Sequence, residues 1–596
     1  MMFRLVILFI GAVILGNHLS AQTRIDTVLT MSDGVRIDVT YIVPSIPKPP
    51  AGFPCIFKVH GLGGSKSVNT AVSLARKGYV GVVYSVRGQG NSEGLRTLNG
   101  AREKQDLREI LEFIKMNAPV DSGRVGINGA SQGGQHSWWA AMEHMGFKTA
   151  VPENAVPGGI TTSNVFPTRL LATFRNSRVR FSAEWDTLYT AVRIDDVEKA
   201  RSFFENSDEK ITSIDIPILF QMAWWDQLFD VTRGIQVFER VPGTKYLYLG
   251  TGGHGSPVSQ REAQFRSNRV NRWFDYWLKG EQNGIDTEDP VVLAITDNWQ
   301  HFTAKTWPLP QVRKTTLWFT PDGKLSLYPI RTIDSMRFGQ RLSRPYGFDD
   351  ADADHWGPKA VAVFAQDTLV FSTVVVHNAT WTGVPEVVVT ARSDGNPYQI
   401  VVQLYQRNRD GKRIWLQNGA FGVRAGDGPG TWREFRFFCK ALGHRFDGAL
   451  EVVIRSLDVY EGRSLVHIPF FNTARCYLKV GGTNGSRIVM PIIVPPSSVG
   501  DDGARRGPAM FDAYPNPVPS LSGKARLRLR FELDRPGPVR VSAWNMLGQR
   551  VASSLLVCDK PGAQSHWIEL PRVKAGIYIL TLHRRGHPLV RKLFVR

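Results

Sequence analysis

The stretch VGINGASQGGQ, residues 125–135, decides the fold of this chain. Its apolar first half favours a β-strand, its second half opens a run compatible with a helix, and glycines at 129 and 133 flank Ser131. A serine on so sharp a turn holds a strained backbone, and glycine on either side lets the neighbouring backbone pass without a Cβ clash. The Ser131 hydroxyl is thereby exposed beside the N-terminus of the helix. The backbone N–H of Gln132 then points to where an oxyanion would form, and the helix dipole favours that negative charge.

Ser131 is therefore a candidate nucleophile, although an ordinary serine on a glycine-rich turn would show the same five residues. The two interpretations of Ser131 differ in whether an acid and a base follow it in the chain. The apolar strand predicted at 216–224 runs into Asp226, and the strand predicted at 245–249 runs into a glycine-rich loop that contains His254. The carboxyl ends of parallel strands meet at the edge of a sheet where ligands bind. The order serine, aspartate, histidine is that of the catalytic triad in an α/β hydrolase.

Each of these residues has an ordinary explanation when it is taken singly. Asp226 would then cap a loop, and His254 would be a surface histidine. Asp230 is the main rival for the acid, but it lies four residues further along, in the following loop or helix. The three residues together, in this order and at strand ends, predict a Ser131-Asp226-His254 triad.

Strands and helices alternate before the serine turn, which predicts a mostly parallel sheet covered on both faces. Strands are predicted at 27–31, 36–43, 55–59 and 80–84, and helices at 69–77 and 101–116. The third of these strands runs into His60-Gly61-Leu62-Gly63-Gly64. An α/β hydrolase draws its second oxyanion N–H from a loop in this position, and Leu62 is the predicted donor. A plain glycine-rich strand exit is the alternative.

The N-terminus has the features of a secretory signal peptide. Arg4 precedes an apolar stretch at 5–15, and small residues precede a cleavage point after Ala21. A membrane anchor is the alternative, but the apolar stretch is short. No later run reaches the roughly 20 apolar residues of a membrane-spanning helix. We therefore expect a secreted or cell-surface protein with no transmembrane segment in the mature chain.

Composition limits the remaining possibilities. A chain of 596 residues with 42% hydrophobic and 21% charged residues is typical of a soluble protein of several domains. The four cysteines are scattered, and Cys439 and Cys476 could pair. No Cys/His cluster has metal-ligand spacing, so neither a metal nor a cofactor is expected.

The positive charge is concentrated near the C-terminus. The net charge is +20, and residues 510–596 hold 15 Lys and Arg against 5 Asp and Glu. These cations alternate with apolar residues along predicted strands, and no recognition helix accompanies them. We interpret them as the solvated face of a β domain rather than a nucleic-acid site.

Several segments resemble the X-prolyl dipeptidyl peptidase and cocaine esterase (CocE/NonD) type of α/β hydrolase. They are Val86–Gly94, which is similar to V-R-G-x-G-x-S-x-G; the turn at Ser131; Trp225-Asp226; and Arg272–Gly280 with its sequel Asn283-Gly284-Ile285. The resemblance, from about residue 25 to about 480, implies a helical cap, about 156–213, and a C-terminal jelly roll. Many family members place a tyrosine in the oxyanion hole, whereas the loop here reads HGLGG. Two backbone donors are therefore expected.

Short strand-like runs support the jelly roll independently, because most of them are separated by turn residues. They are Thr315–Phe319, Val361–Phe364, Thr368–Ser372, Glu386–Ala391, Gln399–Gln406, Trp432–Phe438 and Leu450–Arg455.

The last 87 residues resemble the C-terminal sorting domain of the type IX secretion system. Three motifs carry the resemblance in order: Tyr514-Pro515-Asn516-Pro517, Asn545-Met546-Leu547-Gly548-Gln549 and Ala575-Gly576-Ile577-Tyr578. The resemblance implies export across the outer membrane, with the secretion machinery as a partner. An ordinary adhesive β module would explain the predicted strands but not the motifs.

The predicted architecture is thus an α/β hydrolase with an inserted helical cap, a β jelly-roll sandwich and a small C-terminal β-sandwich. The predicted boundaries are a signal peptide at 1–21, a catalytic domain at 22–308, a jelly roll at 309–482, a linker at 483–509 and the sorting domain at 510–596.

The sequence predicts a serine hydrolase but leaves its substrate open. Aromatic side chains could line an acyl pocket, although tryptophans beside such a turn are as often core residues. The candidates are Trp138, Trp139, Trp185, Trp224 and Phe229. An esterase or acylase is favoured, because the tyrosine is missing and the cap is short. An X-Pro dipeptidyl peptidase and a surface binding protein with a vestigial site are the alternatives.

Overall fold

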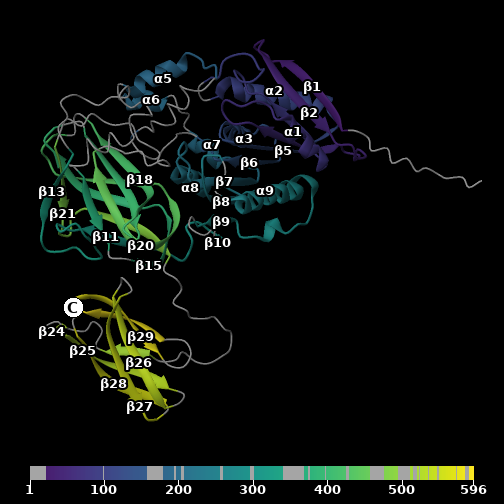
Figure 1. The fold of residues 1–596 in the computed structure, drawn as a ribbon. Coiled ribbons are helices and arrows are strands. Elements are labelled where there is room, and N and C mark those ends of the chain that lie inside the picture. Colours follow the sequence, from purple (N-terminus) through teal and green to yellow (C-terminus); the bar gives the residue numbers. More distant parts are fainter. Residues whose placement is uncertain are drawn as a thin grey trace, which may run out of the picture.

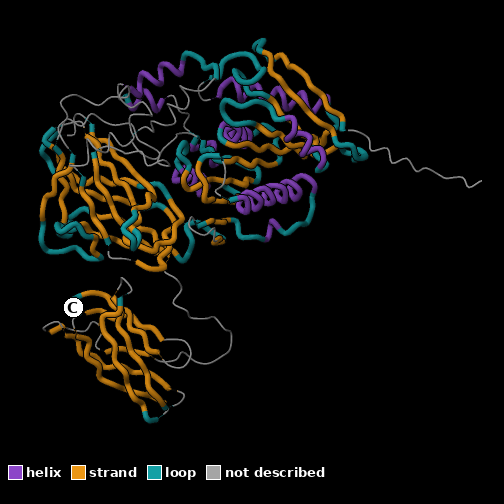
Figure 2. Tube along the Cα trace, viewed as in Figure 1, coloured by secondary structure: helices purple, strands orange, loops and turns teal. Residues whose placement is uncertain are grey.

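The computed structural model places three β-rich units along the chain (Figure 1). It describes residues 22–97, 100–157, 165, 179–193, 196–202, 207–255, 259–295, 301–339, 368–373, 376–395, 398–424, 428–456, 475–493, 511–514, 520–521, 524–533, 536–545, 549–560, 562–571, 573–583 and 589–595. The helices lie in the N-terminal half of the chain, and strands dominate the rest (Figure 2).

The N-terminal unit is built on a sheet that has ten strands in the described residues, in the order β1-β2-β4-β3-β5-β6-β7-β8-β9-β10. Their bounds are β1 Thr23–Thr30, β2 Arg36–Val43, β3 Phe53–Val59, β4 Val80–Tyr84, β5 Val120–Ala130, β6 Thr149–Glu153, β7 Ile218–Trp225, β8 Lys245–Gly253, β9 Val291–Ala294 and β10 His301–Ala304. The strands from β4 to β9 pair in parallel, and the outer strands pair antiparallel. This confirms the predicted α/β-hydrolase fold.

Helices cover both faces of this sheet. They are α1 (Val68–Arg76), α2 (Ala101–Asn117), α3 (Gln132–Met142), α8 (Val231–Arg240) and α9 (Gln260–Phe274), and α9 continues into a π-helical turn, η2 (Asp275–Lys279). Alternate strand residues pack into different cores: Phe57 joins the cluster under α2, α3 and α8, whereas Ile56 joins the cluster under α9. Burial on both faces explains why strands such as β4 are apolar throughout.

An insertion between β6 and β7 supplies the predicted cap. The described part contains α5 (Glu184–Arg193), α6 (Val197–Ser202) and α7 (Asp208–Thr212). The backbone of Arg180 binds the 86–94 loop and the residues just after it, because its N–H donates to the Gly88 carbonyl and its carbonyl accepts the Arg96 N–H. The cap is thus tied to the rim of the sheet.

The second unit is a β domain whose described residues form twelve paired strands. The strands are β11 Val312–Phe319, β12 Leu325–Ser326, β13 Asp334–Phe338, β14 Leu369–Ser372, β15 Val376–Gly383, β16 Glu386–Ser393, β17 Tyr398–Arg407, β18 Arg413–Val423, β19 Arg433–Phe438, β20 Leu442–Arg455, β21 Cys476–Val480 and β22 Arg487–Ile493. All pairings between them are antiparallel. The predicted run Val361–Phe364 lies outside the described residues, and the other predicted runs fall in these strands.

One predicted boundary needs correction at the end of this unit. The jelly roll was expected to end at residue 482, but β22 pairs with β11 from Arg487 to Ile493. The apolar strand β22 lies within the stretch 483–509 that was expected to be the linker. The domain therefore reaches residue 493.

This β domain packs directly on the strand that leads to Asp226. The Gln417 side chain donates to the Trp224 carbonyl at 2.8 Å, and the Trp225 indole donates to the Leu416 carbonyl at 3.0 Å. One hydrophobic cluster runs through both units. The two units therefore share a core.

The C-terminal unit has two sheets with four strands each in the described residues. They are built from β23 Phe511–Tyr514, β24 Ser520–Leu521, β25 Lys524–Leu533, β26 Gly537–Asn545, β27 Arg550–Cys558, β28 Gly562–Pro571, β29 Gly576–His583 and β30 Leu589–Val595. Their apolar residues form a separate core, in agreement with the predicted small β-sandwich.

Two further expectations can be compared with the structure. All four cysteines are free and buried, so Cys439 and Cys476 do not pair. No helix in the described part of the chain is long and apolar enough to cross a membrane. The predicted signal peptide lies outside the described residues.

Candidate active site

Ser131 lies on the turn between β5 and α3 with φ 57° and ψ −119°. A positive φ is rare outside glycine and is held only where the surroundings enforce it. Here the flanking glycines allow close backbone contact: a Cβ on Gly129 would lie 2.5 Å from the Gly133 carbonyl carbon, and one on Gly133 would lie 2.2 Å from the Val59 oxygen. The Ser131 N–H donates to the Glu153 carbonyl at 2.9 Å, which ties the turn to β6.

Asp226 and His254 lie side by side at the ends of β7 and β8. His254 Nδ1 is 2.9 Å from Asp226 Oδ2 and 3.1 Å from Oδ1. The carboxylate is buried and also accepts the N–H groups of Leu228 and Phe229 at 2.8 and 2.9 Å. Because a carboxylate only accepts, Nδ1 carries the proton and Nε2 is left as a base. The His254 N–H donates to the Gln227 side chain at 2.9 Å, which holds the loop.

Asp230, the other candidate for the acid, has a structural role. It is the N-cap of α8, and its carboxylate accepts the N–H of Thr232 at 2.9 Å. This is the ordinary use of an aspartate before a helix.

The nucleophile and the base approach from different strands. β5 and β8 are separated by β6 and β7, so the turn and the loop must reach toward each other across the strand ends. No hydrogen bond joins the Ser131 hydroxyl to His254 in the part of the chain that the structure describes. Catalytic hydrogen bonds of this kind are often long before substrate binds.

The predicted oxyanion donors lie on either side of Ser131. A Cβ on Gly61 would be 3.8 Å from the Ser131 Cβ, so the loop that carries Leu62 lies against the nucleophile. The Leu62 N–H has no hydrogen-bond partner among the described residues. Gln132 is the first residue of α3, where an N–H has no acceptor within the helix. Both donors are thus available to a ligand.

Gln89 joins the two donor segments, and sequence reasoning did not single it out. Its side chain accepts the N–H of Gly63 at 2.8 Å and donates to the Gln132 side chain at 2.8 Å. Gln89 and Gln132 are both buried. The only sequence signal was the place of Gln89 within the Val86–Gly94 motif.

His60 fixes the start of the oxyanion loop. Its Nδ1 is 2.7 Å from the Gly61 carbonyl, and its Nε2 accepts the Val86 N–H at 2.9 Å. Burial holds the pKa of His60 below its usual range, so the ring is neutral and donates only through Nδ1.

Asn154 is a second residue that the sequence did not reveal. It follows β6 beside Ser131, since Ala130 and Glu153 are register partners. It has φ 43°, it is 1% exposed, and neither its amide oxygen nor its amide nitrogen has a hydrogen-bond partner among the residues that the structure describes. A buried and unpaired carboxamide beside a nucleophile is a candidate contact for a substrate.

The five aromatic residues predicted to line a pocket do not gather in one place. Trp138, Trp139 and Trp224 are packed in the core: the first donates to the Ala155 carbonyl, and the last to that of Ala294. Their position next to the turn and the strand end reflects packing, because these elements are buried on both faces. Trp185 is buried in α5 of the cap.

Phe229 is the remaining candidate, and it does lie at the site. Its ring centroid is 5.6 Å from that of His254. In the described part of the chain, no group of side chains could hold a metal ion.

Part of the N-terminal unit is similar to a known protein family. Residues 33–175 match the family described as X-Pro dipeptidyl-peptidase (S15 family). A Bacillus cereus protein provisionally named as an Xaa-Pro dipeptidyl-peptidase is 35% identical over 89 residues, which cover 15% of this chain and 12% of that relative.

Two solved structures are similar over most of the chain. A CocE/NonD family hydrolase from Staphylococcus aureus has a TM-score of 0.63 at 16% identity, and the match covers 79% of this chain and 94% of that one. An α-amino acid ester hydrolase has a TM-score of 0.61 at 17% identity and covers 81% and 98%. At this identity the likeness concerns the fold. Together with the family match, it indicates a serine hydrolase, either an esterase or a peptidase.

Proposed function

We propose that this chain is a serine hydrolase that cleaves an ester or amide acyl bond through an acyl-enzyme. The observation that carries the proposal is the hydrogen-bonded pair of buried Asp226 and partly buried His254, at the same edge of the parallel sheet as the strained Ser131 turn. Asp226 holds the imidazole in the tautomer whose Nε2 accepts a proton.

The reaction follows from these roles. The Ser131 Oγ attacks the acyl carbon as His254 takes the hydroxyl proton, and the N–H groups of Gln132 and Leu62 stabilise the oxyanion. His254 then returns the proton to the leaving group as the acyl bond breaks. A water molecule then attacks the acyl-enzyme as His254 takes its proton, and this second step releases the carboxylic acid and free Ser131.

We propose an esterase or acylase rather than an X-Pro dipeptidyl peptidase, because a dipeptidyl peptidase needs a carboxylate for the free α-amino group. Glu153, whose carbonyl accepts the Ser131 N–H, is already paired through its side chain with Lys58 at 3.4 Å and Arg266 at 3.2 Å. Glu184 and Asp186 of the cap are exposed. The buried Asn154 carboxamide suits a neutral polar group on the acyl portion instead.

Two assays test these assignments. Ser131→Ala is expected to abolish burst release of p-nitrophenol from a p-nitrophenyl ester while the melting temperature stays unchanged; retained activity would refute the nucleophile. Parallel hydrolysis of phenyl acetate and Gly-Pro-p-nitroanilide separates the two substrate classes. Preference for the anilide would favour the dipeptidyl peptidase.

We also propose export through the segment at 1–21 and the unit at 510–596, on the strength of the sequence motifs. A chain that lacks residues 510–596 is expected to keep its hydrolase activity but to remain within the cell envelope, on the inner side of the outer membrane. Undiminished activity in the medium or on the cell surface would argue against a sorting role.

A further inference from the structure

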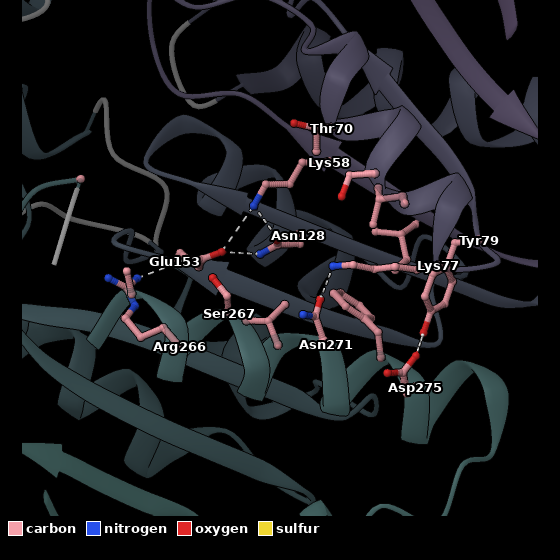
Figure 3. A pocket seen from close by; sticks show the side chains of 17 residues that line it. Lys58, Thr70, Lys77, Tyr79, Asn128, Glu153, Arg266, Ser267, Asn271 and Asp275 are labelled. Atoms are coloured by element: carbon pink, nitrogen blue, oxygen red, sulfur yellow. Dashed lines mark hydrogen bonds and ion pairs between the residues drawn. The ribbon is translucent and has the colours of Figure 1, made fainter. Parts of the chain in front are cut away.

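The helices α1 and α9 flank a crevice and present a polar stripe to it from each side. Leu74 of α1 and Val270 of α9 pack on one hydrophobic cluster, and the polar stripes lie beside these apolar contacts. On α1 the stripe includes Thr70, Ser73 and the C-cap Lys77, and on α9 it includes Ser267 and Asn271. These side chains leave a crevice of about 410 Å³ between the two helices, with β3, β5 and β6 as its floor (Figure 3).

Small side chains open this α1–α9 crevice, and some of their polar groups have no partner. The hydroxyls of Ser73 and Ser267 make no hydrogen bond in the described part of the chain. Lys77 reaches across the crevice to the Asn271 side chain at 2.8 Å. Ser73, Lys77 and Ser267 are exposed, so the polar side of the crevice faces solvent and can be reached by a ligand.

A charged network forms the floor of the crevice. Glu153 accepts from Asn128 at 2.7 Å and is paired with Lys58 at 3.4 Å and Arg266 at 3.2 Å (Figure 3). Burial raises the pKa of Glu153, but Lys58 and Arg266 outweigh that effect and hold the pKa below its usual range. The carboxylate is therefore charged and shared between two cations.

The crevice has an excess of positive charge. Its lining holds Lys58, Lys77 and Arg266 against Glu153 and Asp275. Asp275 is paired at 2.7 Å with Lys279, which does not line the crevice and is also 3.5 Å from Glu281. The lining therefore has one more cation than it has carboxylates, and the exposed hydroxyls of Ser73 and Ser267 lie beside this excess charge.

We propose that the α1–α9 crevice binds a small anion of the carboxylate or phosphate type, held by Lys58 and Lys77 and by the hydroxyls of Ser73 and Ser267. Cations and hydroxyls are the groups that bind such oxyanions by charge-assisted hydrogen bonds. This site is separate from Ser131, and its occupancy does not depend on the proposed hydrolase activity.

The crevice is nevertheless connected to the candidate active site. Gly255, one residue after His254, lines it, and the Glu153 carbonyl accepts the Ser131 N–H. An anion that draws Lys58 away from Glu153 would shift the residues that hold the Ser131 turn and the His254 loop in place. This coupling rests on the proposed function, whereas the binding itself does not.

Isothermal titration of the full chain with inorganic phosphate and, separately, with succinate tests the site at constant ionic strength. Saturable binding of at least one anion is expected, and the anion that binds more tightly identifies the ligand class. Lys77→Glu and Ser267→Asp are each expected to weaken binding at least about tenfold, because each adds a negative charge to the crevice.

The neighbouring exposed residues provide matched controls. Arg76→Glu and Asn268→Asp make the same charge changes one residue away, outside the crevice, and are expected to change the affinity by less than about twofold. Absence of saturable binding by either anion, or equal weakening in the controls, overturns the site. A wild-type ester hydrolysis rate that is unchanged at saturating anion refutes the coupling alone.

Discussion

Asp226→Asn separates the orienting role of this carboxylate from its role in the fold. In the wild-type structure one carboxylate oxygen, Oδ1, accepts the N–H groups of Leu228 and Phe229 at 2.8 and 2.9 Å. In the variant the amide oxygen takes that place, so the NH₂ group faces His254 Nδ1. Because an NH₂ group donates, Nδ1 must accept and the ring proton moves to Nε2. Nε2 can then no longer take the proton of Ser131.

The expected loss of kcat is about 10⁴-fold, or roughly 5 kcal/mol of transition-state stabilisation. The assay is kcat for a p-nitrophenyl ester at neutral pH, combined with guanidinium unfolding. Asp230→Asn is the matched control, since asparagine caps a helix as well as aspartate does; kcat is expected to stay unchanged. A kcat of Asp226→Asn within about tenfold of wild type, or an equal loss in Asp230→Asn, would refute the reasoning.

Three further predictions concern residues around the site. Gln89→Leu leaves the buried Gln132 amide oxygen unpaired and releases the N–H of the exposed Gly63, so denaturant unfolding should show a loss of about 1–3 kcal/mol together with a lower kcat. Burial lowers the pKa of His136 to about 3 from 6.5, so the unfolded chain binds the extra proton and stability falls as pH drops below 6.5; His136→Gln should recover about 2 kcal/mol of that loss at pH 5, and an unchanged pH profile of unfolding would contradict this. Asn154→Gly keeps the left-handed backbone and removes the carboxamide, so kcat/KM should fall about tenfold without loss of melting temperature; an unchanged kcat/KM would exclude contact with substrate.

The sequence predicts the fold around the candidate site well because its signals are local. The glycines around Ser131 report a backbone geometry that few other residues allow, and the structure has that geometry. The positions of Asp226 and His254 follow from two apolar strands that end just before them. Parallel pairing then brings the strand ends to one edge.

Contacts that depend on side-chain direction were beyond the sequence. Nothing in the local pattern shows that Gln89 reaches both Gly63 and Gln132, because this depends on how two separate loops pack. The same holds for Trp138 and Trp224, whose neighbours in sequence suggested a pocket although both are buried in the core. Packing between distant segments decided these cases.

The jelly-roll boundary was missed for a related reason. Arg487–Ile493 pairs with β11, more than 160 residues earlier in the chain. The end of a β domain along the chain depends on whether the last strand finds such a distant partner. The sequence near that strand does not show the partner.

The most direct measurement of the central claim is labelling of the full chain with a fluorophosphonate, followed by mass spectrometry of the peptides. The account predicts one adduct, on Ser131, which forms much more slowly in His254→Ala and not at all in Ser131→Ala. No adduct would favour a binding protein with a vestigial site. An adduct on another residue, or labelling that persists in Ser131→Ala, would contradict the proposed nucleophile.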